Sequence, residues 1–87
     1  MTVADEIRQR LAILQPSQLE IVDESALHAG HEGAKSGGGH YRMMIVSPLF
    51  TGQGTIKRHR LVYDALGTLM KREIHAMSMT TLSPEET

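Results

Sequence analysis

The chain has 87 residues, of which 40% are apolar, and this length suits one small domain over residues 1–87. It contains no cysteine, which excludes disulfides, thiolate nucleophiles and metal sites built from cysteine alone. The net charge of −1 gives no overall preference for nucleic acid, and the small number of aromatic residues argues against a large aromatic ligand pocket.

The first predicted element is an amphipathic helix over residues 3–14. Apolar side chains recur at steps of four, four and three residues from Val3 to Leu14, with polar residues between them. Thr2, followed three residues later by an acid, is typical of a helix N-cap, and Pro16 provides a stop signal.

Two strands are predicted next, over residues 19–24 ("LEIVDE") and 40–47 ("HYRMMIVS"). The alternation of the second strand places Tyr41, Met43 and Ile45 on one face. We expect the two strands to pair antiparallel. The stretch that joins them is rich in glycine and histidine, and it is much longer than the roughly two to five residues of a usual hairpin loop.

Helical periodicity returns at Ile56 and continues to about Arg72. Gly67 lies within this helix and weakens it by about 1 kcal/mol relative to alanine. The pattern also allows a separate short turn of helix near residues 55–58, ahead of the main helix.

A third strand is predicted over residues 73–81, with His75 and Met77 on one face and Ile74 on the other. The final "SPEE" has the pattern of a helix start, with Ser83 as the cap, but too few residues follow for a helix. The order helix, strand, strand, helix, strand predicts an α+β fold in which helices cover one face of a three-stranded sheet.

Four segments have the order and spacing of a known family: "VDES" with a histidine shortly after it, "HYRMMIVSP", "FTGQGTIKRHRLVYDAL" and "IHAMSM". In these segments the chain resembles the BolA family over nearly its whole length. The resemblance implies a fold similar to the class II KH domain, in the order α-β-β-α-α-β. It also implies a role in iron-sulfur trafficking and iron homeostasis, as the partner of a monothiol glutaredoxin. The two proteins would share a bridging [2Fe-2S] cluster together with glutathione.

The same resemblance implies which residues hold the cluster. One ligand is the histidine that opens the last strand, His75, and the other lies in the loop after the first strand. Counting from "DES" makes His28 the first choice and His31 the alternative. Two imidazoles can replace two thiolates on one iron, and because histidine ligates only when neutral, such a cluster should be labile. We interpret His40 as structural, and His59 as structural or as part of a partner or nucleic-acid surface.

The alternative function is DNA-binding transcriptional regulation, which the resemblance also implies for some bacterial members. It would act through the basic helix of residues 55–72, although nothing in the sequence supplies base readout. The candidate phosphate contacts are Lys57, Arg58, Arg60, Lys71 and Arg72.

Catalysis is not expected. The chain lacks the nucleophile pattern G-x-S-x-G, and "HEG" at His31 lacks the second histidine of a zinc-protease motif. The first residues do not have the pattern of a signal peptide, and no stretch has the roughly 18 apolar residues of a membrane span. We therefore expect a cytoplasmic protein with no membrane partner.

Overall fold

The computed structural model describes residues 2–25 and 39–87. The predicted loop ligands His28 and His31 therefore lie outside the described residues. The main elements, in chain order, are α1 (Val3–Leu11), β1 (Gln18–Asp23), β2 (Gly39–Val46), α3 (Thr55–Leu66) and β3 (Ile74–Leu82). Short 3-10 segments accompany them, over Ala12–Leu14, Pro48–Phe50, Gly67–Lys71 and Pro84–Glu86.

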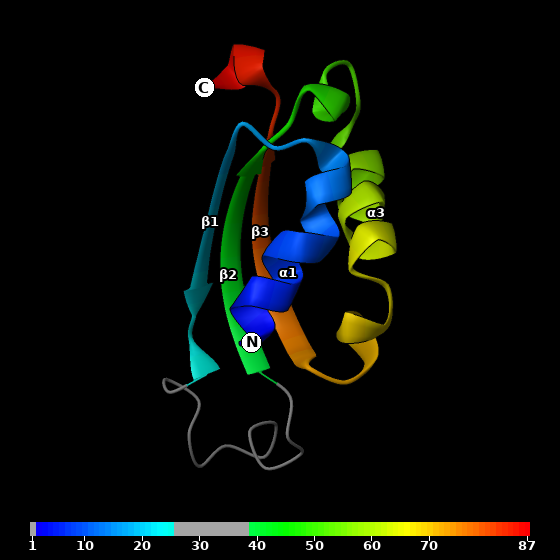
Figure 1. Ribbon diagram of the computed structural model, residues 1–87. Helices are drawn as coiled ribbons and strands as arrows, with labels where there is room; N and C mark the ends of the chain where they lie inside the picture. Colours follow the sequence, from blue (N-terminus) through cyan, green and yellow to red (C-terminus); the bar gives the residue numbers. More distant parts are fainter. Residues whose placement is uncertain (1, 26–38) are drawn as a thin grey trace.

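The three strands form one mixed sheet in the order β1-β2-β3. Strands β1 and β2 pair antiparallel, as predicted, whereas β2 and β3 pair parallel. A parallel pair needs a crossover connection, and α3 provides it. Helices α1 and α3 lie on the same side of the sheet (Figure 1). The predicted α+β fold, with a three-stranded sheet covered on one face, is confirmed.

The core lies between the helices and the covered face of the sheet. Tyr41, Met43 and Ile45, which the alternation placed together, are all buried there. They form one cluster with side chains of both helices, such as Ile7 and Leu66, each of which has no exposed surface. Complete burial of one such aliphatic side chain contributes about 1.5–3 kcal/mol, so this cluster is the main source of stability.

The first helix begins as predicted. The hydroxyl of Thr2 accepts a hydrogen bond from the backbone N–H of Asp5, and the Asp5 carboxylate accepts one from the N–H of Thr2, which completes a capping box. The last predicted turn, up to Leu14, is 3-10 rather than α-helical. Gln15 then adopts a left-handed conformation, with φ of 52°, ahead of Pro16.

The second helix differs from the prediction at both ends. Residues 55–58 are the first turn of α3 itself and not a separate turn. The α-helix also ends at Leu66, because Gly67 adopts a φ of 54°, which glycine tolerates without steric cost. The predicted continuation towards Arg72 is a 3-10 segment instead.

Strand β3 carries an irregularity that the predicted alternation did not include. Gly39 of β2 pairs with Ile74, but the next residue, His40, pairs with Ala76, so His75 is an extra residue on β3. A bulge of this kind reverses the side-chain alternation on one side of it. Ile74 is therefore buried in the same core that Met77 packs against, and the prediction that these two side chains lie on opposite faces is wrong.

None of the helices in residues 2–25 and 39–87 is both long enough and apolar enough to cross a membrane.

Candidate functional site

His75 lies at the end of the sheet where β2 and β3 begin, and its side chain is exposed. The bulge brings it next to His40 on the neighbouring strand. The centroids of the two imidazole rings are 5.1 Å apart and the ring planes are inclined by 45°. The sheet thus brings together two imidazoles that are distant in the sequence, one predicted as a ligand and the other interpreted as purely structural.

The backbone of His40 is held by the "VDES" segment. The Oγ atom of Ser25 accepts a hydrogen bond from the His40 N–H at 3.0 Å, and the N–H of Glu24 donates to the His40 carbonyl at 2.7 Å. Asp23 in turn accepts the N–H of Ser25 at 2.9 Å. Hydrogen bonds from the side chain and the backbone of Ser25 lower the pKa of the Asp23 carboxyl group, so this acceptor stays ionised. The motif residues therefore fix the strand segment that carries His40.

Gly39 is required by the close packing at this point. A Cβ atom there would lie 2.6 Å from Cε2 of the Tyr41 ring and 3.0 Å from Oγ of Ser25. The ring cannot yield easily, because Tyr41 is buried, and this burial also raises the pKa of its hydroxyl. The sequence analysis did not single out Gly39, although a glycine at a strand start can mark a close approach of this kind.

The side chains described at this end of the sheet that can bind a metal are imidazoles. Among the described residues, no three or more histidine, aspartate or glutamate side chains gather closely enough to enclose a metal ion. Imidazole nitrogens suit zinc, iron, copper and nickel, and an exposed imidazole leaves room for ligands from elsewhere. His59 lies on α3, in the helical layer, and does not belong to this pair.

Arg58, one of the five predicted phosphate contacts, is engaged inside the protein. Its Nε donates to the carbonyl of Gln53 at 2.7 Å, and its Nη1 donates to the carbonyl of Thr81 at 3.0 Å. The same Nη1 forms an ion pair with Glu86 at 2.5 Å, and only 11% of the Arg58 side chain is exposed. Arg58 therefore stabilises the fold through these internal bonds, and its contact with a phosphate stays a prediction.

The other four predicted contacts are exposed, on α3 and on the segment after it: Lys57, Arg60, Lys71 and Arg72. Their contacts with phosphates stay predictions.

The ion pair of Arg58 also organises the last residues. Ser83 and Glu86 form the capping box that "SPEE" predicted, with the Ser83 N–H donating to the Glu86 carboxylate at 2.7 Å. The hydrogen bond from Arg58, and after it that from the Ser83 backbone, lowers the pKa of Glu86 to about 2.

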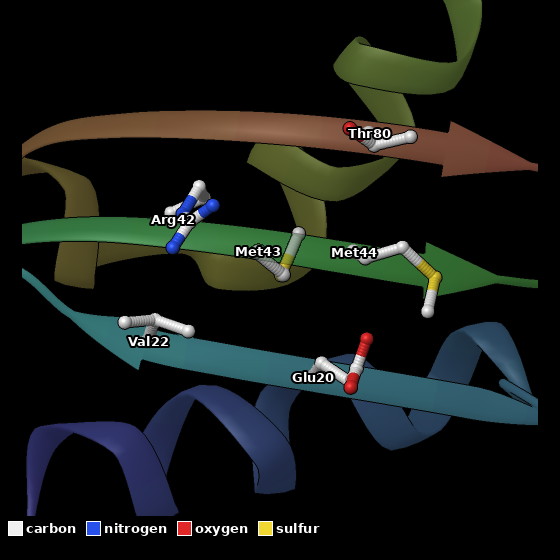
Figure 2. A pocket seen from close by; sticks show the side chains of 6 residues that line it. All are labelled: Glu20, Val22, Arg42, Met43, Met44 and Thr80. Carbon is white, nitrogen blue, oxygen red and sulfur yellow. The ribbon is translucent and has the colours of Figure 1, made fainter.

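The sheet face away from the helices carries a shallow hollow (Figure 2). Side chains from all three strands line it, and one of them, Arg42, forms an ion pair with Glu24 at 3.1 Å. This mixture of charged, polar and apolar groups is not a metal donor set. The lining residues are Glu20, Val22, Arg42, Met43, Met44 and Thr80.

Comparison with known proteins identifies the family. A family model described as BolA-like protein matches residues 11–86. The DNA-binding transcriptional regulator BolA of Escherichia coli is 34% identical over 99% of this chain and 80% of the regulator. SufE-like protein 1 of Arabidopsis thaliana, named chloroplastic/mitochondrial, is 40% identical over 92% of this chain, but the match spans only 23% of that protein. Protein BOLA1 of the same plant, named chloroplastic, is 39% identical over 95% of this chain and 54% of its own length.

The fold also matches solved structures of BolA proteins. The BolA domain of SufE1 from Arabidopsis thaliana superposes with a TM-score of 0.85 at 38% identity, covering 100% of this chain and 98% of that domain. BolA1 from the same plant gives a TM-score of 0.83 at 35% identity, with the same coverage of 100% and 98%. The family model spans most of the chain and the fold agrees throughout, so this chain belongs to the BolA family.

Proposed function

We propose that this chain binds a monothiol glutaredoxin and completes the coordination of a [2Fe-2S] cluster that the two proteins share with glutathione, in iron-sulfur cluster trafficking and iron homeostasis. His75 would be one ligand, and His28, or alternatively His31, the other. The observation that carries the proposal is the exposed imidazole of His75 on a bulge of an otherwise regular strand.

The residue types of the chain support a cluster for which the partner and glutathione supply thiolates and this chain supplies imidazoles. Iron-sulfur clusters are held mainly by thiolates, and this chain has no cysteine, so the thiolates must come from the partner and glutathione. Imidazoles on the remaining iron raise its potential and bind only when neutral. A cluster held in this way can be released on protonation or passed on.

The direct test is reconstitution. The chain is mixed with a monothiol glutaredoxin, glutathione, iron and sulfide, and visible absorption and circular dichroism are recorded on the purified heterodimer. We expect a coloured complex whose spectrum changes in His75→Ala and stays unchanged in His59→Ala. Of the two loop variants, His28→Ala should change the spectrum and His31→Ala should not.

Two outcomes would contradict the proposal. If no coloured heterodimer forms, cluster sharing is wrong. If His75→Ala folds, as judged by far-ultraviolet circular dichroism, and gives the wild-type spectrum, the ligand assignment is wrong.

A second candidate, DNA-binding regulation, is favoured by the exposed cations Lys57 and Arg60 on α3 and by the name of the bacterial relative. Each phosphate contact adds about 0.9 to the slope of log affinity against log salt. Removing both Lys57 and Arg60 should thus lower that slope by about 2 in fluorescence anisotropy with a promoter fragment. Equal, weak binding to every fragment at moderate salt would exclude specific regulation.

The absence of catalysis and the cytoplasmic location stay predictions. Two of the plant relatives carry names that place them in chloroplasts or mitochondria, and those names apply to those proteins.

A further inference from the structure

An apolar hollow lies between α3 and the two 3-10 segments Ala12–Leu14 and Pro48–Phe50, near the end of the sheet where β2 finishes (Figure 1). Its volume is about 260 Å³. Two of the side chains that line it are large, apolar and exposed, Ile13 by 72% of its surface and Leu49 by 44%. Exposed apolar surface gathered in this way marks a candidate for contact with another protein. The lining residues are Ile13, Leu14, Leu49, Leu61, Asp64 and Ala65.

Two opposite charges lie on α3 beside this hollow. Lys57, Leu61 and Asp64 are spaced by four and three residues, so they lie on one stripe of the helix with the leucine between the charges. Lys57 and Asp64 are about 10.5 Å apart along the helix axis, which is too far for them to pair with each other. Both are exposed, and neither forms an ion pair within residues 2–25 and 39–87. The stripe therefore presents an unpaired cation at one end and an unpaired anion at the other.

We propose that this surface is a dimer interface, on which α3 of a second copy of the chain packs antiparallel to the first. A two-fold axis between residues 60 and 61 places residue 57 of one copy opposite residue 64 of the other. Each Lys57 then meets the Asp64 of the other copy, and the two Leu61 side chains lie close to the axis. The charge pattern is thus complementary to itself, as an interface between two identical surfaces requires.

The apolar contacts and the charges have different effects in this dimer. Covering Ile13 and Leu49 removes apolar surface from water, which favours association. The pairs of Lys57 and Asp64 lie at the exposed edge, where ion pairs add little affinity but fix the orientation of the two copies. The net charge of −1 per chain causes little repulsion between copies. Because the hollow is small, we expect a weak, reversible dimer.

The interface leaves the proposed cluster ligand accessible. The carbonyl of Leu14, which lines the hollow, accepts the hydroxyl of Ser47 directly after β2. His75 lies at the opposite end of the sheet, where β3 begins. Self-association and the sharing of a cluster therefore use different ends of the molecule, and the dimer does not depend on the proposed function.

The test is sedimentation velocity of the full chain from micromolar to millimolar concentrations, without glutaredoxin or metal. We expect a dimer whose population rises with concentration. Ile13→Ser should raise the dissociation constant by about tenfold or more, because both copies lose an apolar contact. The matched control is Val22→Ser. Val22 is also an exposed aliphatic residue, at 43%, but it lies on the sheet face away from the helices, so this variant should dimerise as the wild type does.

Charge reversal tests the orientation of the two copies. Lys57→Glu places two carboxylates together at both contacts, and Asp64→Lys places two ammonium groups together, so each variant alone should dimerise about tenfold more weakly. An equimolar mixture of the two variants should recover dimerisation, because opposite charges then meet at both contacts of the mixed dimer. Lys71→Glu reverses the charge of an exposed lysine outside the hollow and should have no effect.

Three outcomes would overturn the proposal, provided that far-ultraviolet circular dichroism shows each variant to be folded. A chain that stays monomeric at every concentration would mean that a different protein covers the hollow. A dimer that Ile13→Ser does not weaken would use another surface. If the mixture of the charge variants fails to recover dimerisation, the antiparallel arrangement is wrong. Ile13→Ala replaces Ile13→Ser if the latter does not fold. Because glutaredoxin, iron and sulfide are left out, these results are distinct from those of the cluster reconstitution.

Discussion

The two ends of the sheet use their polar side chains in opposite ways. At the His75 end, where β2 and β3 begin, the imidazole of His75 is exposed and lies next to that of His40. At the Arg58 end, where the same strands finish, the guanidinium of Arg58 bonds two carbonyls and a carboxylate of the protein itself. The polar groups that Arg58 joins stabilise the fold, whereas the exposed side chain of His75 is accessible from outside the protein.

Ser47 is a second polar side chain near the Arg58 end whose hydrogen bonds are all made inside the protein. It has no exposed surface, its hydroxyl donates to the Leu14 carbonyl at 2.5 Å, and the same oxygen accepts the Leu49 N–H at 3.1 Å. This one side chain ties the 3-10 segment after α1 to the turn after β2. Buried polar groups satisfied in this way fix the geometry of a fold, and each is costly to remove.

The largest expected effect is at the Arg58 end. Arg58→Ala leaves the carbonyls of Gln53 and Thr81 without their donor, so we expect a loss of about 2–3 kcal/mol in the free energy of unfolding by urea denaturation. Arg60→Ala, two residues further on the exposed surface of the same helix, should change it by less than about 0.5 kcal/mol. If both variants lose the same free energy of unfolding, Arg58 is no more important for stability than Arg60.

A serine at Gly39 tests the packing at the His75 end. Its Cβ would overlap the buried ring of Tyr41, so Gly39→Ser should cost about 1–3 kcal/mol in the same measurement. The matched change is Gly54→Ser, where the space is open and the residue is the N-cap of α3. Because serine is a slightly better N-cap than glycine, this variant should gain a few tenths of a kcal/mol. A destabilised Gly54→Ser with an unaffected Gly39→Ser would contradict this interpretation.

Ser25→Ala should have an intermediate effect. It removes the acceptor of the His40 N–H, at a site that is only half-buried, so we expect a loss of about 1 kcal/mol. The exposed Ser78 on β3 is the control, since Ser78→Ala should be neutral within about 0.5 kcal/mol. If Ser25→Ala is equally neutral, the "VDES" turn does not support the His40 strand.

The smallest effect expected is the pH dependence of the Glu86 contact, because solvent at the surface screens it. The pKa of Glu86 is lowered from 4.5 to about 2 in the folded chain. The carboxylate of Glu86 therefore makes its full contribution to the free energy of unfolding at pH values above 4.5, the pKa in the unfolded chain. This contribution is lost as the pH falls towards about 2. The difference in stability between wild type and Glu86→Gln should be constant near neutral pH and shrink between about pH 5 and pH 2.

The Arg58→Ala background provides the control for this titration, since the hydrogen bond from Arg58 is the main cause of the lowered pKa. In that background, the effect of Glu86→Gln should depend much less on pH. If the effect of Glu86→Gln depends on pH as strongly as in the wild type, a group other than Arg58 lowers the pKa of Glu86.

Much of the molecule follows from local patterns. The caps at Thr2 and Ser83, the covered face of β2 and the element order depend on residues close in sequence, whose spacing sets the side-chain directions. The family could be inferred from the same sequence, because its motifs retain their order and spacing. For His75, the sequence indicated the candidate residue and its strand, but not its neighbour.

Other features were decided only by the tertiary structure. The parallel pairing of β3, the bulge at His75, the contact of His40 with His75 and the internal role of Arg58 all join residues far apart in the chain. Strand register and side-chain partners arise from how distant segments pack, and no local periodicity contains that information. For this reason the sequence predicted His75 as a ligand and residues 55–72 as a basic helix. The fold determined that the imidazole of His40 lies beside that of His75 and that Arg58 is bonded inside the protein.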